Sequence, residues 1–298
     1  MDFSAQDPYS RMISIARTIR EILWEKGFVE VFVPVIRAHD CSPFTPRIKL
    51  QDGGYLQDSP ALALRRQLKQ FDKVFSLSPC FRDEEPDATH LRQFHMLDLY
   101  QRDATLREII ELFKILITKF YGGPIEEMSI ADKIHEDLNV DLKNNSTADE
   151  QLVQTLSKVY NTYTSNGVDL LDRWIREEVE PLSINKCLIL TDFPWFAEAR
   201  AKPKTSATCI AERAEFLINE TETVHIYEDD PDVEGFVIRS KKSKQFGEED
   251  EIMKGLVNSG DVPRKSAGGA IGIERLCASS IGLADMSDLV PFADFIDS

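Results

Sequence analysis

A polar segment between two apolar runs carries residues that could bind a phosphorylated nucleotide. Residues 79–100 read PCFRDEEPDATHLRQFHMLDLY, with Arg82, Glu84, His90 and Arg92 in the polar part and Phe94 in the second apolar run. A guanidinium group can hold two phosphate oxygens at once. A flat aromatic ring can stack on a nucleobase. These residue types together indicate contacts to a nucleoside phosphate.

A second segment, GGAIGIERL near the C-terminus, offers complementary groups. Gly268, Gly269 and Gly272 allow a close approach of the backbone, and Arg275 adds another cation. The sequence contains neither GxxxxGK[ST] nor a GxGxxG that follows a strand. The two commonest nucleotide-binding folds are therefore not supported.

A third segment supplies carboxylates that could bind a metal ion. Glu222, Glu228 and Asp229 lie in ETVHIYEDD. Mg²⁺ prefers oxygen ligands and is commonly shared with the phosphates of a bound nucleotide. Arginines, carboxylates and an aromatic ring together indicate a magnesium nucleotide.

The elements that would position these residues follow from hydrophobic periodicity and from turn residues. Apolar residues at helical spacing predict a helix over 10–26 that ends at Gly27. A strand over 28–35 is expected next, with Pro34 at an edge or an end of the sheet. Further along, the sequence predicts a helix over 59–71, capped by Asp58 or Ser59 with Pro60 in the first turn, a hairpin of strands 73–81 and 93–101, and a helix over 105–121.

The C-terminal half is less regular. Residues 122–185 are acidic, partly helical and without a recognisable motif. Beyond them we expect a strand within 185–194, two strands within 210–230 joined by a turn at Asn219–Thr221, a helical stretch to about 260, and a Gly-rich strand that runs into a helix over 266–283. Hairpins interleaved with helices predict an α+β fold, a single domain with an antiparallel or mixed sheet flanked by helices.

Composition and the distribution of apolar residues argue against several classes of protein. A net charge of −16 over 298 residues disfavours a broad electrostatic grip on nucleic acid. The N-terminus has no apolar core of a signal peptide, and no run approaches the roughly 18 apolar residues of a membrane span. A cytoplasmic protein without membrane contact is expected. The five cysteines are widely spaced, so neither zinc nor a disulfide framework is expected.

Taken together, the segments resemble the three signature motifs of a class II aminoacyl-tRNA synthetase catalytic domain of the lysine, aspartate and asparagine subgroup. GFVEVFVPV, with Pro34, resembles motif 1, which builds a dimer interface. FRDE…THLRQFHMLDLY resembles motif 2, and GGAIGIERL resembles motif 3. The resemblance covers most of the chain except 122–185. It implies a single catalytic domain over 1–298, the use of ATP and Mg²⁺, and a homodimer.

The resemblance also implies roles for individual residues. Arg82 would bind the α-phosphate and Arg275 the γ-phosphate, and both would be catalytic because adenylation depends on positioning and charge stabilisation. The other ATP contacts would be Glu84 to the adenine amino group, His90 with Arg92 to the β,γ-phosphates, Phe94 stacked on adenine, and Gly272. Glu222 and Asp229 sit seven residues apart, as the magnesium-binding acids do in the lysine enzymes, and Glu228 is the alternative to Asp229.

The amino-acid pocket implied by the resemblance matches the lysine enzymes at some positions and departs from them at others. Tyr100 stands where lysine enzymes have a tyrosine, Asp98 replaces a nearby glutamate, and Leu64 replaces the lysine that aspartate enzymes use. Three departures involve Ala61 in place of a residue that contacts the α-amine, His225 in place of an asparagine, and Ala270 in place of a motif 3 glycine. With an alanine at this position, the chain also resembles the free-standing lysine ligase that modifies elongation factor P. The preferred substrate of that ligase is a β-amino acid. A lysine-like or β-amino acid is therefore the expected substrate.

The function implied by the resemblance is ATP-dependent activation of an amino acid as its adenylate, followed by ligation to an acceptor. Because the predicted catalytic core starts at the first helix, an anticodon-binding domain is not expected. A protein side chain or a small molecule is the expected acceptor, and tRNA is not favoured. Two alternatives stay open, a reduced aminoacyl-tRNA ligase of the lysyl or asparaginyl type and a non-catalytic regulatory paralogue.

Overall fold

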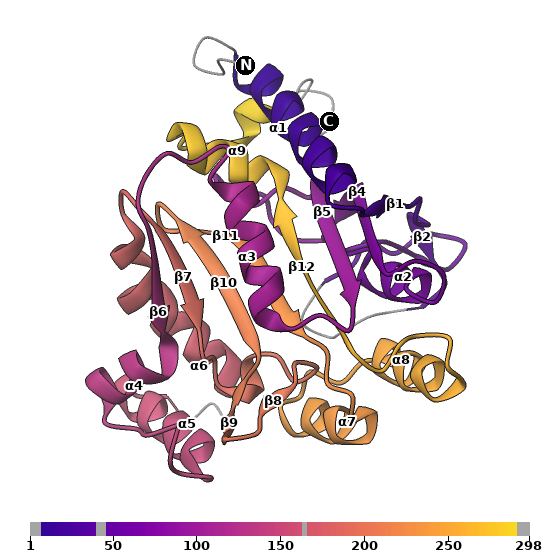
Figure 1. Ribbon diagram of the computed structural model, residues 1–298. Helices are drawn as coiled ribbons and strands as arrows, with labels where there is room; N and C mark the ends of the chain where they lie inside the picture. Colours follow the sequence, from indigo (N-terminus) through magenta and orange to yellow (C-terminus); the bar gives the residue numbers. More distant parts are fainter. Residues whose placement is uncertain (1–6, 40–45, 163–165, 291–298) are drawn as a thin grey trace.

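A computed structural model describes residues 7–39, 46–162 and 166–290 and contains a mixed eight-stranded sheet (Figure 1). In order across the sheet, the strands are β1 (Val29–Glu30), β4 (Lys73–Phe81), β5 (Gln93–Arg102), β12 (Ser266–Gly272), β11 (Thr221–Glu228), β10 (Arg213–Ile218), β7 (Cys187–Thr191) and β6 (Ile125–Ser129). Neighbours are antiparallel except β1 with β4 and β6 with β7. The predicted α+β class, with a largely antiparallel sheet flanked by helices, is confirmed.

Three helices build the main core against one face of the sheet: α1 (Pro8–Glu25), α3 (Leu106–Ile117) and α9 (Ile273–Ile281). In Figure 1, α3 crosses the middle of the sheet, and α1 and α9 lie side by side near the N-terminus. The fully buried side chains of this core include Ile15, Ile19, Leu23, Phe75, Leu97, Leu99, Phe113, Phe216, Ile226 and Ile271. Burial of this much apolar surface is the main stabilising contribution to the fold.

The strand period of two places different residues on the opposite face. On β5, Leu97 and Leu99 enter the core, whereas Met96, Asp98 and Tyr100 point to the side that carries the cavity. The helices α2 (Ala61–Gln67), α6 (Gly167–Trp174) and α8 (Glu248–Ser259) contribute residues to this side, and α7 (Val233–Lys242) packs on α8. The helical stretch predicted to about residue 260 corresponds to α7 and α8.

Residues 122–185 form a second core beside the sheet. They supply the edge strand β6 and the helices α4 (Ile130–Leu138), α5 (Ala148–Val159) and α6, which bury Trp174 and Phe193 against β7. The sequence IEEMS of β6 did not reveal a strand because its second and third residues are acids. Charged residues are common on edge strands, where they discourage pairing with other chains.

The shorter elements complete the structure. Two small ribbons pair β2 (Ile36–Arg37) with β3 (Tyr55–Leu56), and β8 (Pro203–Lys204) with β9 (Ala207–Ala211). Short helical turns cover Ile175–Val179, Glu180–Ser183, Trp195–Ala197 and Met286–Leu289. Among the described residues, no helix is both long enough and apolar enough to cross a membrane. Four cysteines, Cys80, Cys187, Cys209 and Cys277, are free and buried, and Cys41 lies outside the described residues.

Several predicted boundaries were wrong. The strand expected over 28–35 is reduced to β1, because only Val29 and Glu30 are in register with β4. The Val31 N–H still donates to the Phe75 oxygen at 2.9 Å, and residues 32–35 leave the sheet. Helix α2 is shorter than the predicted 59–71, and Pro60 is its N-cap rather than a first-turn residue. Ser59 nevertheless accepts a hydrogen bond from the backbone N–H of Ala61, 3.2 Å away, as expected for a polar residue before a helix.

Candidate ATP and amino-acid site

The floor of the site is a row of residues that crosses four strands. Asp98 on β5 is opposite Ala270 on β12, Ala270 is opposite His225 on β11, and His225 is opposite Glu215 on β10. Directly paired residues on one face of a sheet lie about 5 Å apart. Strand register therefore brings together three of the residues expected to bind the amino acid and adds Glu215, which the sequence analysis did not select.

Above this floor lies a cavity of about 380 Å³ that is lined by Arg82, Phe94 and Arg275. The guanidinium carbon of Arg82 is 5.3 Å from the centre of the Phe94 ring. Arg275 Nη1 donates to the backbone oxygen of Glu222 at 3.1 Å. Two cations and an aromatic ring from distant parts of the sequence thus surround one cavity.

The Nε atom of Arg82 is buried and has no hydrogen-bond partner among the residues that the structure describes. An unsatisfied buried donor is unfavourable, because it has lost its hydrogen bonds to water. A phosphate oxygen is a suitable partner for such a group. The donor set at Arg82 therefore fits an anionic ligand.

Of the other predicted ATP contacts, Glu84 and His90 line the same cavity, whereas Arg92 does not. His90 Nδ1 is 2.9 Å from a carboxylate oxygen of Asp87. The backbone N–H of Thr89 and the side chain of His90 lower the pKa of Asp87 to about 2, so it is an anion that orients His90. Arg92 is exposed and donates to Asp83 at 2.7 Å, so the structure does not support its predicted contact to phosphate.

The glycines of motif 3 differ in whether the structure leaves room for a side chain at their positions. A Cβ atom at Gly268 would lie 2.3 Å from the backbone oxygen of Leu99, and one at Gly269 would lie 2.5 Å from that of His225. The neighbouring strands therefore require both glycines. At Gly272, which lines the cavity, a Cβ atom would meet only the side chain of Arg275, at 3.5 Å or more.

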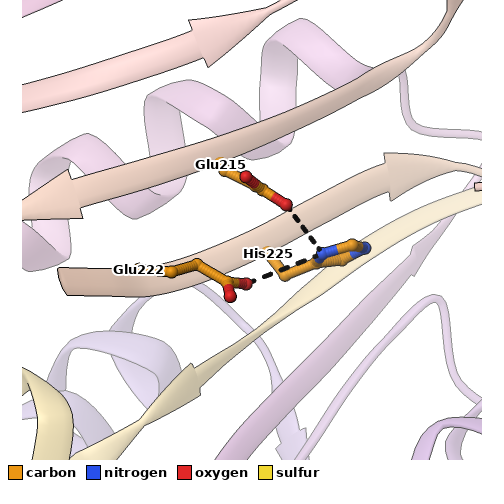
Figure 2. A group of neighbouring side chains, drawn as sticks. All are labelled: Glu215, Glu222 and His225. Atoms are coloured by element: carbon orange, nitrogen blue, oxygen red, sulfur yellow. Dashed lines mark ion pairs between the residues drawn. The ribbon is translucent and has the colours of Figure 1, made fainter. Parts of the chain in front are cut away.

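Glu215, Glu222 and His225 form a compact cluster at the cavity wall, shown in Figure 2. One potential ligand atom from each lies within 4.8 Å of the others. His225 Nδ1 is 3.6 Å from Glu215 and 3.9 Å from Glu222. The hairpin turn at Asn219 and Glu220, both with positive φ, joins the two strands. This turn geometry suits a tight hairpin.

A β-bulge explains why Glu222 faces the cavity. Phe216 is opposite Val224, but the next residue, Leu217, is opposite Glu222, so Thr223 is the extra residue on β11. A bulge changes the direction of the side chains beside it. Without this bulge, Glu222 would share the core-facing side of β11 with Val224.

The charge of Glu215 is fixed by its surroundings. Burial raises the pKa of this carboxyl, but the adjacent Arg213 guanidinium and the nearby His225 side chain outweigh burial and hold the pKa well below its usual range. Arg213 donates directly to Glu215. Glu215 is consequently a carboxylate at neutral pH, which is the form that binds a metal ion.

The acids predicted to bind magnesium, Glu222 with Asp229 or with Glu228 as the alternative, do not come together. Glu222 and Glu228 are six residues apart on one extended strand, a separation of about 20 Å. Glu228 is buried, 2.7 Å from Lys202, and accepts from the backbone N–H of Leu106. Asp229 instead holds Arg65 at 2.6 Å. Glu215 and Glu222 are also seven residues apart, and the hairpin brings these two acids together. The spacing that indicated a metal site was therefore present in the sequence for this pair as well.

All five predicted amino-acid contacts line the cavity: Ala61, Asp98, Tyr100, His225 and Ala270. Asp98 is 2% exposed, and one of its oxygens accepts from the Ser59 hydroxyl at 3.1 Å. Burial raises the pKa of Asp98 to about 7. Arg65, which the sequence analysis missed, also lines this end, and its guanidinium carbon lies 4.5 Å from the centre of the Tyr100 ring. No pattern in the sequence distinguished it from the adjacent Arg66.

A second cavity, of about 750 Å³, shares Arg82, His90 and Arg275 with the first. Its outer wall comes from the segment 122–185, through residues that include Asp169, Asp172, Arg176 and Glu180. Burial raises the pKa of Asp172 to about 6. The segment without a recognisable motif therefore extends the site.

The fold agrees with comparisons to known proteins. The family described as tRNA synthetases class II (D, K and N) matches residues 6–295. The chain belongs to this family. The matched range includes residues 122–185.

The similar curated proteins are named as lysine–tRNA ligases. The chain is 28% identical to the Saccharolobus solfataricus enzyme, over 94% of this chain and 63% of the relative. It is 25% identical to the Thermotoga maritima enzyme, over 97% and 63%, and 25% identical to a probable cytoplasmic lysine–tRNA ligase of Enterocytozoon bieneusi, over 96% and 65%. The chain thus spans less than two thirds of the length of these relatives.

Proposed function

We propose that this protein activates an amino acid with ATP, as the aminoacyl-adenylate, and transfers the aminoacyl group to an acceptor. The observation that carries the proposal is the convergence of Arg82, Phe94 and Arg275 on one cavity. Family membership supports it, because the motifs that supply these three residues are the ones that bind ATP in such enzymes.

In this proposal ATP lies across the cavity with adenine against the Phe94 ring. Glu84 would accept from the adenine amino group, and Arg82 would hold the α-phosphate through its buried Nε donor. His90 and Arg275 would hold the outer phosphates from opposite sides. Preorganised cations of this kind stabilise the charge that develops in the transition state.

Magnesium would be held by Glu215 and Glu222, with His225 beside them. Both carboxylates provide the oxygen ligands that Mg²⁺ prefers, and Glu215 is ionised at neutral pH. When bound, the ion would neutralise charge on the phosphates. The positive charge of Arg213 next to Glu215 keeps this acid in place before the metal arrives.

The reaction needs little covalent chemistry from the protein. A carboxylate oxygen of the amino acid attacks the α-phosphorus, the bond from that phosphorus to the bridging oxygen breaks, and pyrophosphate leaves with the electron pair. An acceptor nucleophile then attacks the acyl carbon, and AMP leaves. The contribution of Arg82 and Arg275 is to position the phosphates and stabilise their charge.

The acceptor would approach through the second cavity. Seven carboxylates and five arginines line it, and the whole chain carries a net charge of −16. This excess of negative charge supports an amine as acceptor, from a protein side chain or a small molecule, over a polyanionic RNA. A tRNA acceptor is the second candidate, because the similar proteins are named as lysine–tRNA ligases.

A homodimer is part of this proposal. The region of motif 1 exposes four large apolar side chains, Trp24 (52%), Val29 (37%), Phe32 (102%) and Ile36 (63%), next to the edge strand β1. Clustered exposed apolar residues mark interaction surfaces. A second copy that packs on this region would cover them.

The proposal is tested by ATP–pyrophosphate exchange with a panel of α- and β-amino acids. At least one amino acid should give exchange well above a reaction without amino acid. ATP binding without exchange for any of them would instead favour the non-catalytic paralogue. Acceptor choice is then tested by transfer of the radiolabelled aminoacyl group to tRNA, to polyamines or to protein.

A further inference from the structure

The deep end of the amino-acid cavity contains a cation that belongs to the protein. Arg65 projects from α2 and is 4% exposed. Its Nη2 and Nε atoms lie 2.6 and 3.2 Å from the two carboxylate oxygens of Asp229. This bidentate geometry is the strongest form of arginine–carboxylate pairing.

Two aromatic rings complete the surroundings of this guanidinium. Its central carbon lies 4.5 Å from the centre of the Tyr100 ring and 5.3 Å from that of Tyr227, and it also donates to the Tyr227 hydroxyl. A carboxylate together with two electron-rich rings around one cation is a set of groups that suits a cationic side chain. In this chain the Arg65 guanidinium is already the cation that these groups bind.

A ligand with a positively charged side chain would therefore find the Asp229 carboxylate already paired with Arg65. It would have to displace Arg65 from a buried ion pair, which is strongly unfavourable because one charge is then left without its partner. If it did not displace Arg65, it would place a second cation beside the guanidinium.

A different group in the cavity lacks a partner. Asp98 is 2% exposed, yet its Oδ1 atom has no hydrogen-bond partner among the described residues. Its Oδ2 atom accepts from Ser59. Ala61 and Ala270, both small, leave room next to it along the cavity wall. An ammonium group would supply the donor that Oδ1 lacks.

We propose that Arg65 acts as a built-in substitute for a cationic side chain, so that the cavity selects a small amino acid without a positively charged side chain, whose ammonium group binds Asp98. This inference rests on the proposed function and narrows its substrate class. The sequence analysis expected a lysine-like or a β-amino acid as substrate. The inference argues against lysine and favours a β-amino acid without a charged side chain or a small α-amino acid.

The test is direct binding, measured by calorimetry in the presence of a non-hydrolysable ATP analogue. The wild-type protein should bind at least one of glycine, L-alanine and β-alanine at least tenfold more tightly than L-lysine. The Arg65→Ala variant, which frees Asp229 and opens the deep end, should gain at least tenfold in affinity for L-lysine. The matched control is Arg66→Ala, which removes an exposed arginine from the same helix and should keep the wild-type order.

Three outcomes would overturn the inference: wild-type protein that binds L-lysine more tightly than all three small amino acids, no gain in lysine binding by Arg65→Ala, or an equal gain by Arg66→Ala. If Arg65→Ala fails to fold, the wild-type order decides alone. Pyrophosphate exchange is measured separately. Its absence with every amino acid would contradict the proposed function, while the binding order would still decide the role of Arg65.

Discussion

Arg275 Nη1 donates to the backbone oxygen of Glu222 at 3.1 Å, and it lies 3.7 Å from the carboxylate of the same residue. This contact joins the start of α9 to the bulged part of β11. Arg275, which is expected to bind the outer phosphates, and Glu222, which is expected to bind the metal ion, therefore hold each other in position. Changes at either residue should affect both functions.

The first prediction concerns Arg82. Arg82→Ala should reduce the rate of ATP–pyrophosphate exchange by about 100-fold or more, because a preorganised donor to the transition-state charge is lost. Arg92→Ala removes an exposed arginine whose partner is Asp83 and is the matched control, with little expected change. Steady-state exchange kinetics measure both variants. Equal losses in the two would refute the assignment of Arg82.

The second prediction separates the metal-binding acids. Glu215→Gln and Glu222→Gln should each raise the Mg²⁺ concentration for half-maximal exchange by about tenfold or more. Glu228→Gln should leave that concentration unchanged and lower the melting temperature, because Glu228 pairs with Lys202 away from the cavity. A magnesium titration of exchange activity is the measurement. A shift for Glu228→Gln alone would contradict the cluster in Figure 2.

The third prediction concerns pH. The pKa of Asp98 is about 7 in the folded chain and 3.8 is its ordinary value, so between these pH values the folded state keeps a proton that the unfolded state has lost. The free energy of unfolding therefore falls as pH rises through this window, by at most about 1.4 kcal/mol per pH unit from this group.

The side chain of the Asp98→Asn variant does not titrate, so it does not contribute to this fall in the free energy of unfolding. The melting temperature of the variant relative to wild type should rise steadily from pH 4 to pH 7 and then level off. Differential scanning calorimetry at several pH values, without ligands, provides the measurement. A difference that stays constant over this range would mean that Asp98 is already ionised in the folded chain.

The fourth prediction compares two glycines of motif 3. Gly268→Ala places a Cβ atom 2.3 Å from the backbone oxygen of Leu99 and should destabilise the protein by about 1–3 kcal/mol. Gly272→Ala meets only the flexible side chain of Arg275 and should have a much smaller effect on stability. Urea unfolding of both variants tests this difference, which equal destabilisation would contradict.

The fifth prediction concerns oligomeric state. Phe32→Asp places a charge on the exposed apolar residues of motif 1 and should convert a dimer into a monomer, because a charge without a partner is unfavourable at an interface. Ile238→Asp, at a residue that is also exposed but lies on α7, is the control and should remain dimeric. Light scattering coupled to size exclusion gives the mass. A wild-type monomer would refute the proposed dimer.

Local patterns in the sequence determined much of the fold and several of the site residues. The helical spacing that begins after Pro8 fixed α1, with Asp7 accepting from the Ser10 N–H and Gly27 at a φ of +79°. The apolar runs over 73–81 and 93–101 likewise predicted the strands β4 and β5. These features depend on residues close together in the chain, where composition and spacing are sufficient.

Tertiary structure decided the features that depend on distant residues. Glu222 joins Glu215 rather than Asp229 because a bulge and a hairpin set the register of β10 and β11. Arg65 fills the end of the cavity because α2 packs against β5 near Tyr100, and Arg66 on the same helix faces solvent. The sequence determined which residue types are available. Only the pairing of strands and the packing of helices decided which of them meet, because those contacts join segments that no local pattern connects.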